Sequence, residues 1–204
     1  MLATLQEDAR AVGEQAKALM ELATAEKILG YQAVVHGARG WALFEQGAVE
    51  EGLALMREAA ASWLDEGIAW SASLITLVAR AWARQGEIEE GLKLLTDALK
   101  LAHRDEVHWW EAELHREKGA LLLARAPNEA DQAEACFNKA LEVSRAQSAK
   151  SLELRAAVSL ARLWQRQGKV REARDLLAPV YNWFSEGFGM TDLEEAKALL
   201  DELA

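Results

Sequence analysis

The sequence predicts an all-α protein, a right-handed solenoid of antiparallel helix pairs with ten helices. Three observations predict this class. Of 204 residues, 40 are Ala and 31 are Leu, both strong helix formers. Val, Ile and Thr together number only 19 and there are two prolines, so residues that favour strands or interrupt helices are scarce. The third observation is an internal repeat with a period of about 40 residues.

Four segments of the chain repeat a small residue in one helix, a turn, and a second helix with further small residues. The leading small residues recur at intervals of 39, 40 and 42, at Gly40, Ala79, Gly119 and Ala161. In three of the segments a turn glycine follows, at Gly47, Gly86 and Gly168. Gly or Ala at such sites lets two antiparallel helices approach closely. This is the pattern of the tetratricopeptide (TPR) repeat, with longer helix pairs than its usual period of about 34 residues gives.

The turns also predict where the helices lie. We expect them at 3–27, 31–46, 49–66, 69–85, 88–104, 108–125, 129–147, 151–167, 170–185 and 191–203. Pro179 should kink the ninth helix, and Thr191 with Glu194 has the spacing of a capping box. We predict one repeat domain over 1–204, divided into a half repeat (1–30), four repeats (31–68, 69–107, 108–150, 151–187) and a capping helix (188–204).

Charge and targeting signals restrict the partners. The formal net charge of −10 disfavours nucleic acid and anionic membrane surfaces, because both require a basic surface. The first residues carry acids instead of a basic stretch followed by an apolar run, and no apolar run is long enough to span a membrane. The single cysteine cannot form an internal disulfide. We therefore expect a cytoplasmic, water-soluble protein.

No motif in the sequence indicates catalysis. Neither GxxxxGK[ST], GxGxxG, HExxH nor CxxC occurs. His108, Glu111 and His115 share one helical face and could supply metal ligands, but His115 falls at a position that packs between helices. We predict no metal, no cofactor and no enzymatic activity.

The inner face of the predicted array is the candidate binding site. In TPR arrays the first helix of each repeat lines this groove, and its twenty positions here hold six Arg and two Glu, about +4 in a chain of −10. The candidate residues are Trp41, Phe44, Arg80, Arg84, Arg116, Arg155, Arg162 and Arg166, with Trp70 and Trp110 in an aromatic rim. A structural interpretation stands beside this one. Arg84 and Arg166 lie in last turns, where a cation complements the helix dipole, and the Trp residues could fill space between longer helices.

Three segments of the sequence resemble a known repeat family: Trp109–Arg116, Ala133–Leu141 and Ala173–Tyr181. They are similar to the C-terminal repeat region of large bacterial signalling proteins of the MalT-like class. Those proteins join a STAND-type ATPase to an adenylate or guanylate cyclase or to a DNA-binding domain. The resemblance covers roughly residues 30–204 and implies a sensor or partner-binding module, with catalytic domains located upstream.

We interpret the sequence as a non-catalytic module that binds a protein or peptide. The predicted partner segment is acidic, held by Arg forks, with Trp41 and Phe44 packing against an apolar side chain. One alternative is a small-molecule sensor in which the aromatic rim stacks on a ring. Another makes the groove an intramolecular regulatory dock for an upstream ATPase or cyclase.

Overall fold

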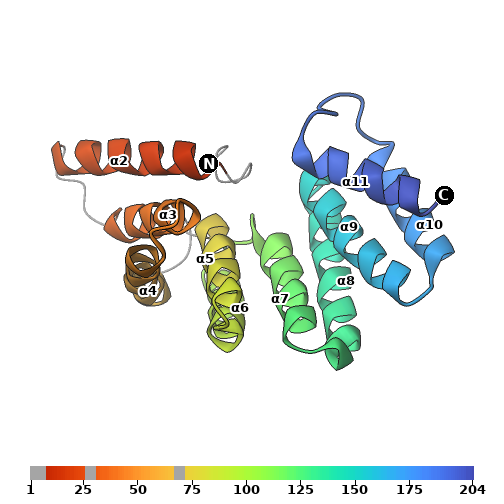
Figure 1. Ribbon diagram of the computed structural model, residues 1–204, viewed down its shortest axis with the longest axis horizontal. Coiled ribbons are helices and arrows are strands. Elements are labelled where there is room, and N and C mark those ends of the chain that lie inside the picture. The colour runs from red at the N-terminus through yellow and green to blue at the C-terminus, as the bar shows by residue number, and fades with distance from the viewer. Residues whose placement is uncertain (1–7, 26–30, 67–71) are drawn as a thin grey trace. The chain divides into compact units, whose positions relative to one another are not determined.

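The computed structural model describes residues 8–25, 31–66 and 72–204, and within them the chain is helical without strands, as predicted. Figure 1 shows the elements in chain order. They are α2 (Ala9–Ala25), α3 (Gln32–Glu45), α4 (Val49–Glu66), α5 (Ala72–Arg84), α6 (Ile88–Arg104), α7 (Glu111–Arg125), the 3-10 turn η1 (Pro127–Glu129), α8 (Ala130–Ala146), α9 (Lys150–Arg166), α10 (Val170–Tyr181) and α11 (Thr191–Glu202). None of the helices described has the length and apolar character needed to cross a membrane.

The predicted helix ends that fall among described residues agree within three residues, with one exception. The helix expected over 170–185 ends at Tyr181, so Pro179 lies in its last turn and does not kink a longer helix. Proline lacks the N–H that would continue the helical ladder, and its ring restricts the residue before it. The expected capping box is also wrong, because α11 has Met190 at its N-cap and no side-chain cap there. The predicted ends at 3, 27 and 69 lie outside the described residues.

Three turn glycines link the helices as the repeat spacing predicts. Gly47, Gly86 and Gly168 have φ values of +94°, +89° and +77°, in the left-handed region that glycine tolerates best. In each turn a backbone N–H just after the glycine reaches back five residues, as Ala48 does to the Leu43 carbonyl at 2.9 Å. The α7–α8 connection is different, since η1 replaces the glycine turn.

The chain divides into two compact units, residues 1–110 and 111–204, and each is described by itself. In unit 1, α3 packs against α4, α5 against α6, and α2 against α3. In unit 2, α8 packs between α7 and α9, while α10 and α11 both contact α9 and each other. The largest fully buried side chains include Trp63, Met56 and Ile75 in unit 1, and Phe137 and Leu160 in unit 2.

The small sites of the repeat lie where helices approach most closely. In unit 1, a Cβ placed on Gly40 would come within 2.8 Å of the Gly52 carbonyl oxygen. In unit 2, a Cβ on Gly119 would lie 2.7 Å from the Phe137 ring and 3.0 Å from the Ala133 carbonyl oxygen. Ala79 and Ala161, at the equivalent sites, are fully buried. The 39-, 40- and 42-residue spacing thus reflects helix contact in both units.

Candidate functional site

Residues of α3 and α5 in unit 1 form a small depression that contains two of the predicted arginines. Its cavity of about 150 Å³ is lined by Trp41, Glu45, Leu77, Arg80, Ala81 and Arg84. Trp41 and Glu45 come from α3, and the other four come from successive turns of α5, so they share one face of that helix. We call this the α3–α5 depression.

Arg84 is held in place at the edge of the depression by two contacts. Its Nη1 donates to Glu45 Oε1, and its guanidinium carbon lies 4.9 Å from the centre of the Phe44 ring. The second contact is a cation–π arrangement. The Arg84 side chain nevertheless remains 54% exposed, and Arg80 is half-buried. The guanidinium of Arg84 is therefore oriented and still accessible to solvent.

Trp41 and Phe44, predicted to pack against a ligand, lie largely in the core. Their exposed fractions are 3% and 4%. Trp41 still lines the α3–α5 depression, whereas the face of Phe44 near Arg84 is taken by that guanidinium. Their apolar area is thus used mainly within unit 1, with only an edge of Trp41 left for a ligand.

In unit 2, Arg116 and Arg155 belong to an internal ion network around Glu113. Arg116 donates two hydrogen bonds to Glu113, from Nε to Oε2 at 2.9 Å and from Nη2 to Oε1 at 2.7 Å. Arg155, on α9, donates from Nη1 to the same Glu113 Oε1 at 3.1 Å and from Nε to Asp192 Oδ2 at 2.8 Å. Glu117 accepts a further hydrogen bond from Arg116. Two guanidinium groups thus face three carboxylates that link α7, α9 and α11.

Because the Glu113 network is buried, the charge of each member depends on its partners. Glu113 is 2% exposed, and both arginine side chains are 15% exposed. Desolvation alone would raise the pKa of Glu113, but the charges of Arg116 and Arg155 outweigh it and lower that pKa from 4.5 to about 2. Desolvation would lower the pKa of Arg116, but the negative charges of Glu113 and Glu117 outweigh it and raise that pKa above its ordinary value. The side chains predicted to hold an acidic partner are here matched by acids of this chain.

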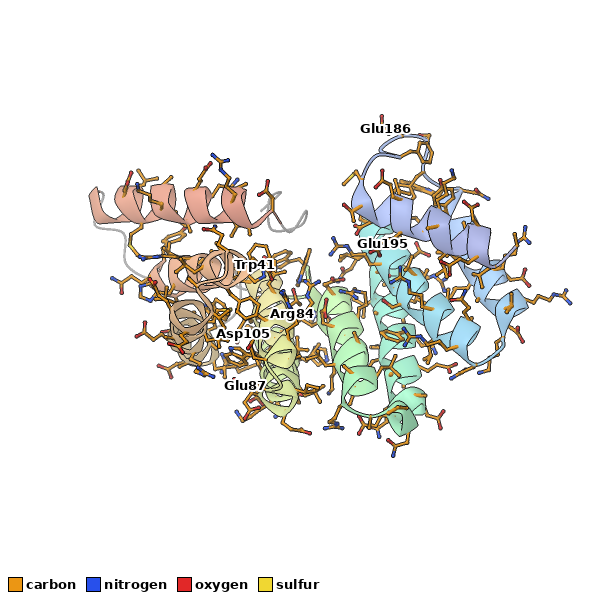
Figure 2. All side chains as sticks on the ribbon, in the orientation of Figure 1. Trp41, Arg84, Glu87, Asp105, Glu186 and Glu195 are labelled. Carbon is orange, nitrogen blue, oxygen red and sulfur yellow. The ribbon has the colours of Figure 1, made fainter. Side chains whose placement is uncertain are left out.

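The remaining predicted arginines lie along the C-terminal half of α9. Arg162 is 48% exposed and its Nη2 lies 3.7 Å from Glu195 Oε2 of α11, which Figure 2 labels. Arg166 is exposed in the last turn of α9. Both retain solvent-accessible guanidinium groups.

Only one tryptophan of the predicted aromatic rim falls among the described residues. Trp110 is 7% exposed in unit 1, and Leu152, at the equivalent repeat position in unit 2, is buried. Trp70 lies outside the described residues. The two histidines considered as ligands belong to different units. His108 places its ring 5.8 Å from that of His103 in unit 1, while His115 Nε2 lies 3.7 Å from Glu111 Oε1 in unit 2.

Sequence reasoning missed the acids that complete the Glu113 network. Glu117 follows Arg116 directly and Glu113 lies three residues before it, so a local signal for this pairing existed. Asp192 carries no such signal, because it meets Arg155 across 37 residues of sequence.

Comparison with known proteins identifies the class of fold. No protein-family model and no curated protein sequence matches the chain. Among solved structures, BtubC (BKLC) from P. vanneervenii is similar with a TM-score of 0.65 and 16% identity, covering 97% of this chain and 87% of that chain. A kinesin light chain-like protein of Podosopora anserina with nearly identical TPR-like repeats is also similar. Its two structures have TM-scores of 0.59 and 0.57 at 16% and 15% identity. They cover 87% and 98% of this chain, and 87% and 90% of theirs.

These likenesses establish a TPR-like helical-repeat fold, as the spacing of small residues predicted. At 15–16% sequence identity, these similarities indicate the fold alone. They do not address the resemblance to the MalT-like class, which stays a prediction.

Proposed function

We propose that this chain is a non-catalytic protein-binding module that holds an acidic segment of a partner at the α3–α5 depression. The repeat fold supports the general part of this proposal, because stacked helix pairs offer extended binding surfaces. The depression supports the specific part. Two arginines and only one carboxylate line it, beside the apolar side chains of Trp41, Leu77 and Ala81.

Recognition would proceed by adding a carboxylate of the partner to an arginine that this chain already orients. Arg84 is already oriented by Glu45 and by the Phe44 ring, so little side-chain entropy is lost when a second carboxylate binds it. A guanidinium offers several donors in one plane and can bind a carboxylate of the partner through two parallel hydrogen bonds. Arg80, one helical turn earlier on the same face, would take a neighbouring acid. Arg162 and Arg166 would extend such contacts independently in unit 2.

Titration with a dye-labelled polyglutamate peptide, followed by fluorescence anisotropy, tests the proposal. The wild-type chain should bind, and binding should weaken as salt screens the charges. Changing Arg80→Glu and Arg84→Glu together should abolish binding. Arg171→Glu is the matched control, since Arg171 is an exposed α10 residue 3.7 Å from Asp175.

Two results would contradict an acidic partner at this site. One is binding that persists in the double variant, and the other is binding that does not respond to salt. If the double variant Arg162→Glu and Arg166→Glu lost binding while the Arg80 and Arg84 double variant kept it, the binding site would lie on α9 instead.

A further inference from the structure

The segment between α10 and α11 forms a second, chemically different surface, entirely within unit 2. Three of the six exposed large hydrophobic side chains among the described residues lie in it: Trp183 (60% exposed), Phe188 (49%) and Met190 (50%). A cavity of about 620 Å³ opens beside them, with walls that include Ser151, Leu154, Trp183, Phe184, Met190 and Leu193. We call this cavity the aromatic pocket.

Buried side chains form the floor of the aromatic pocket, and two packed aromatic rings form part of its wall. Leu154 of α9 and Leu193 of α11 are buried beneath it, with exposed fractions of 0% and 3%. The Trp183 and Phe184 rings meet edge to face, 5.2 Å apart at 86°. Gly187, at φ +80°, turns the chain, and its carbonyl accepts the Met190 N–H at 2.9 Å. The turn at Gly187 and the packing of the two rings therefore position the exposed apolar side chains.

The segment that carries the aromatic pocket has a net negative charge. Residues 182–204 contain six carboxylates and one base, Lys197. Glu186 and Asp192 line the pocket itself; Asp192 is paired with Arg155, whereas Glu186 is exposed to solvent. Figure 2 shows Glu186 at the outer end of the segment, away from the helices. Lys150, whose Nζ lies 5.7 Å from the centre of the Trp183 ring, adds little positive charge because it donates to Glu153 at 2.7 Å.

We propose that the aromatic pocket binds a short segment of another protein in which an apolar anchor side chain is flanked by Lys or Arg. The cavity volume suits one or two large side chains, within the roughly 300–1,000 Å³ of ordinary ligand sites. Phe188, next in sequence to Gly187 of the pocket wall, is exposed outside the cavity, and such additional apolar surface favours a peptide over a small molecule. The acidic surroundings select basic flanks.

The same charges disfavour a second copy of this chain as the occupant. A symmetric dimer through this surface would bring two segments of net charge −5 together, from six acids and one base on each. Like charges brought together at an interface disfavour association. The proposal does not depend on the α3–α5 depression, because the two surfaces belong to different units and prefer opposite charges.

Three short dye-labelled peptides test the anchor and the flanks separately. The first carries a Leu-Phe pair between lysines, the second places the same pair between glutamates, and the third replaces the pair with serines between lysines. Anisotropy titrations of the full chain should show clear binding of the first peptide only. Equal binding of the second would overturn the charge argument, and equal binding of the third would overturn the anchor argument.

Variants then locate the binding site. Trp183→Ser should weaken binding of the first peptide by about tenfold or more, as loss of an interface aromatic does. Glu186→Lys, at an exposed position that does not threaten the fold, should weaken it by about threefold and reduce its salt dependence. The matched controls are Val170→Ser, an exposed apolar residue of α10, and Glu142→Lys, an exposed acid of α8.

Unchanged affinity in both pocket variants would overturn the proposal. So would concentration-dependent self-association that Trp183→Ser removes, if none of the peptides binds, because the occupant would then be a second copy. In every case the Arg80 and Arg84 variants should bind the lysine-flanked peptide as the wild-type chain does.

Discussion

Unit 1 and unit 2 both place arginines on the first helices of their repeats, but they surround them differently. Arg84 in unit 1 faces one carboxylate and one aromatic ring and stays 54% exposed. Arg116 and Arg155 in unit 2 share three carboxylates and are 15% exposed. The same residue type on the same face of the repeat thus stays exposed in one unit and joins helices in the other. The number of nearby acids, together with burial, makes the difference.

The largest expected effect comes from removing the charge of Glu113. Glu113→Gln would leave two buried guanidinium groups sharing fewer anions, and we expect a loss of about 3 kcal/mol in the free energy of unfolding. Urea unfolding followed by circular dichroism measures it. Glu45→Gln is the matched change in unit 1, where the partner is half-exposed, and should cost at most about 1 kcal/mol. Equal costs would remove the contrast between the units.

Acid should weaken unit 2 through the same carboxylate. The pKa of Glu113 is about 2 in the folded chain and 4.5 without neighbours, so the unfolded chain takes up the proton first as the pH falls. Its contribution is complete above the higher value and is lost progressively toward the lower one, amounting to about 3 kcal/mol in full. Unfolding measured between pH of about 5 and about 2.5 should show this decline, and Glu113→Gln should lack that part of it.

A smaller effect, common to both units, is expected at the close helix contacts. Gly40→Ala and Gly119→Ala should each cost about 1–3 kcal/mol, because the added Cβ meets atoms at 2.8 Å and 2.7 Å respectively. Gly189→Ala, where no atom lies within 4 Å of the added Cβ, should stay within about 0.5 kcal/mol. Thermal and urea unfolding report these values. If only one of the two glycines were sensitive, the repeat alignment across the units would be wrong.

The smallest expected change in stability distinguishes binding from structure in unit 1. Arg84→Ala should alter the free energy of unfolding by less than about 1 kcal/mol, since exposed ion pairs contribute little. The same variant should bind the polyglutamate peptide distinctly more weakly than the wild-type chain. A large loss of stability with unchanged binding would give Arg84 the structural role that Arg116 has in unit 2.

Much of the fold could be predicted because its signals are local. Turn glycines and small residues at fixed intervals placed α4 and α6 at their observed bounds. The sequence prediction placed the end of α10 four residues too late, because helix-forming residues lie next to Pro179. For the same reason it did not predict the aromatic pocket that follows the helix. Gly187 and Gly189 between aromatic residues were the available signal for that segment.

The candidate site was less predictable because it depends on contacts between distant residues. The arginine stripe was visible from helical periodicity, but its charge balance was not. Glu113 is one of the two Glu at the predicted groove positions, yet nothing in the sequence showed that it would bind two arginines from different helices. Burial of Trp41 and Phe44 likewise follows from packing between helices, which spacing does not specify.

The Glu113 network also has a consequence for how unit 2 opens. Arg155 bonds to Glu113 of α7 with one nitrogen and to Asp192 of α11 with another, so a single side chain spans helices that are some 80 residues apart in sequence. When α11 detaches, Arg155 loses an anion and its hold on α7 becomes weaker. Amide hydrogens of α7 and α11 should therefore exchange with solvent together, as one cooperative group, while those of α8 stay protected longer.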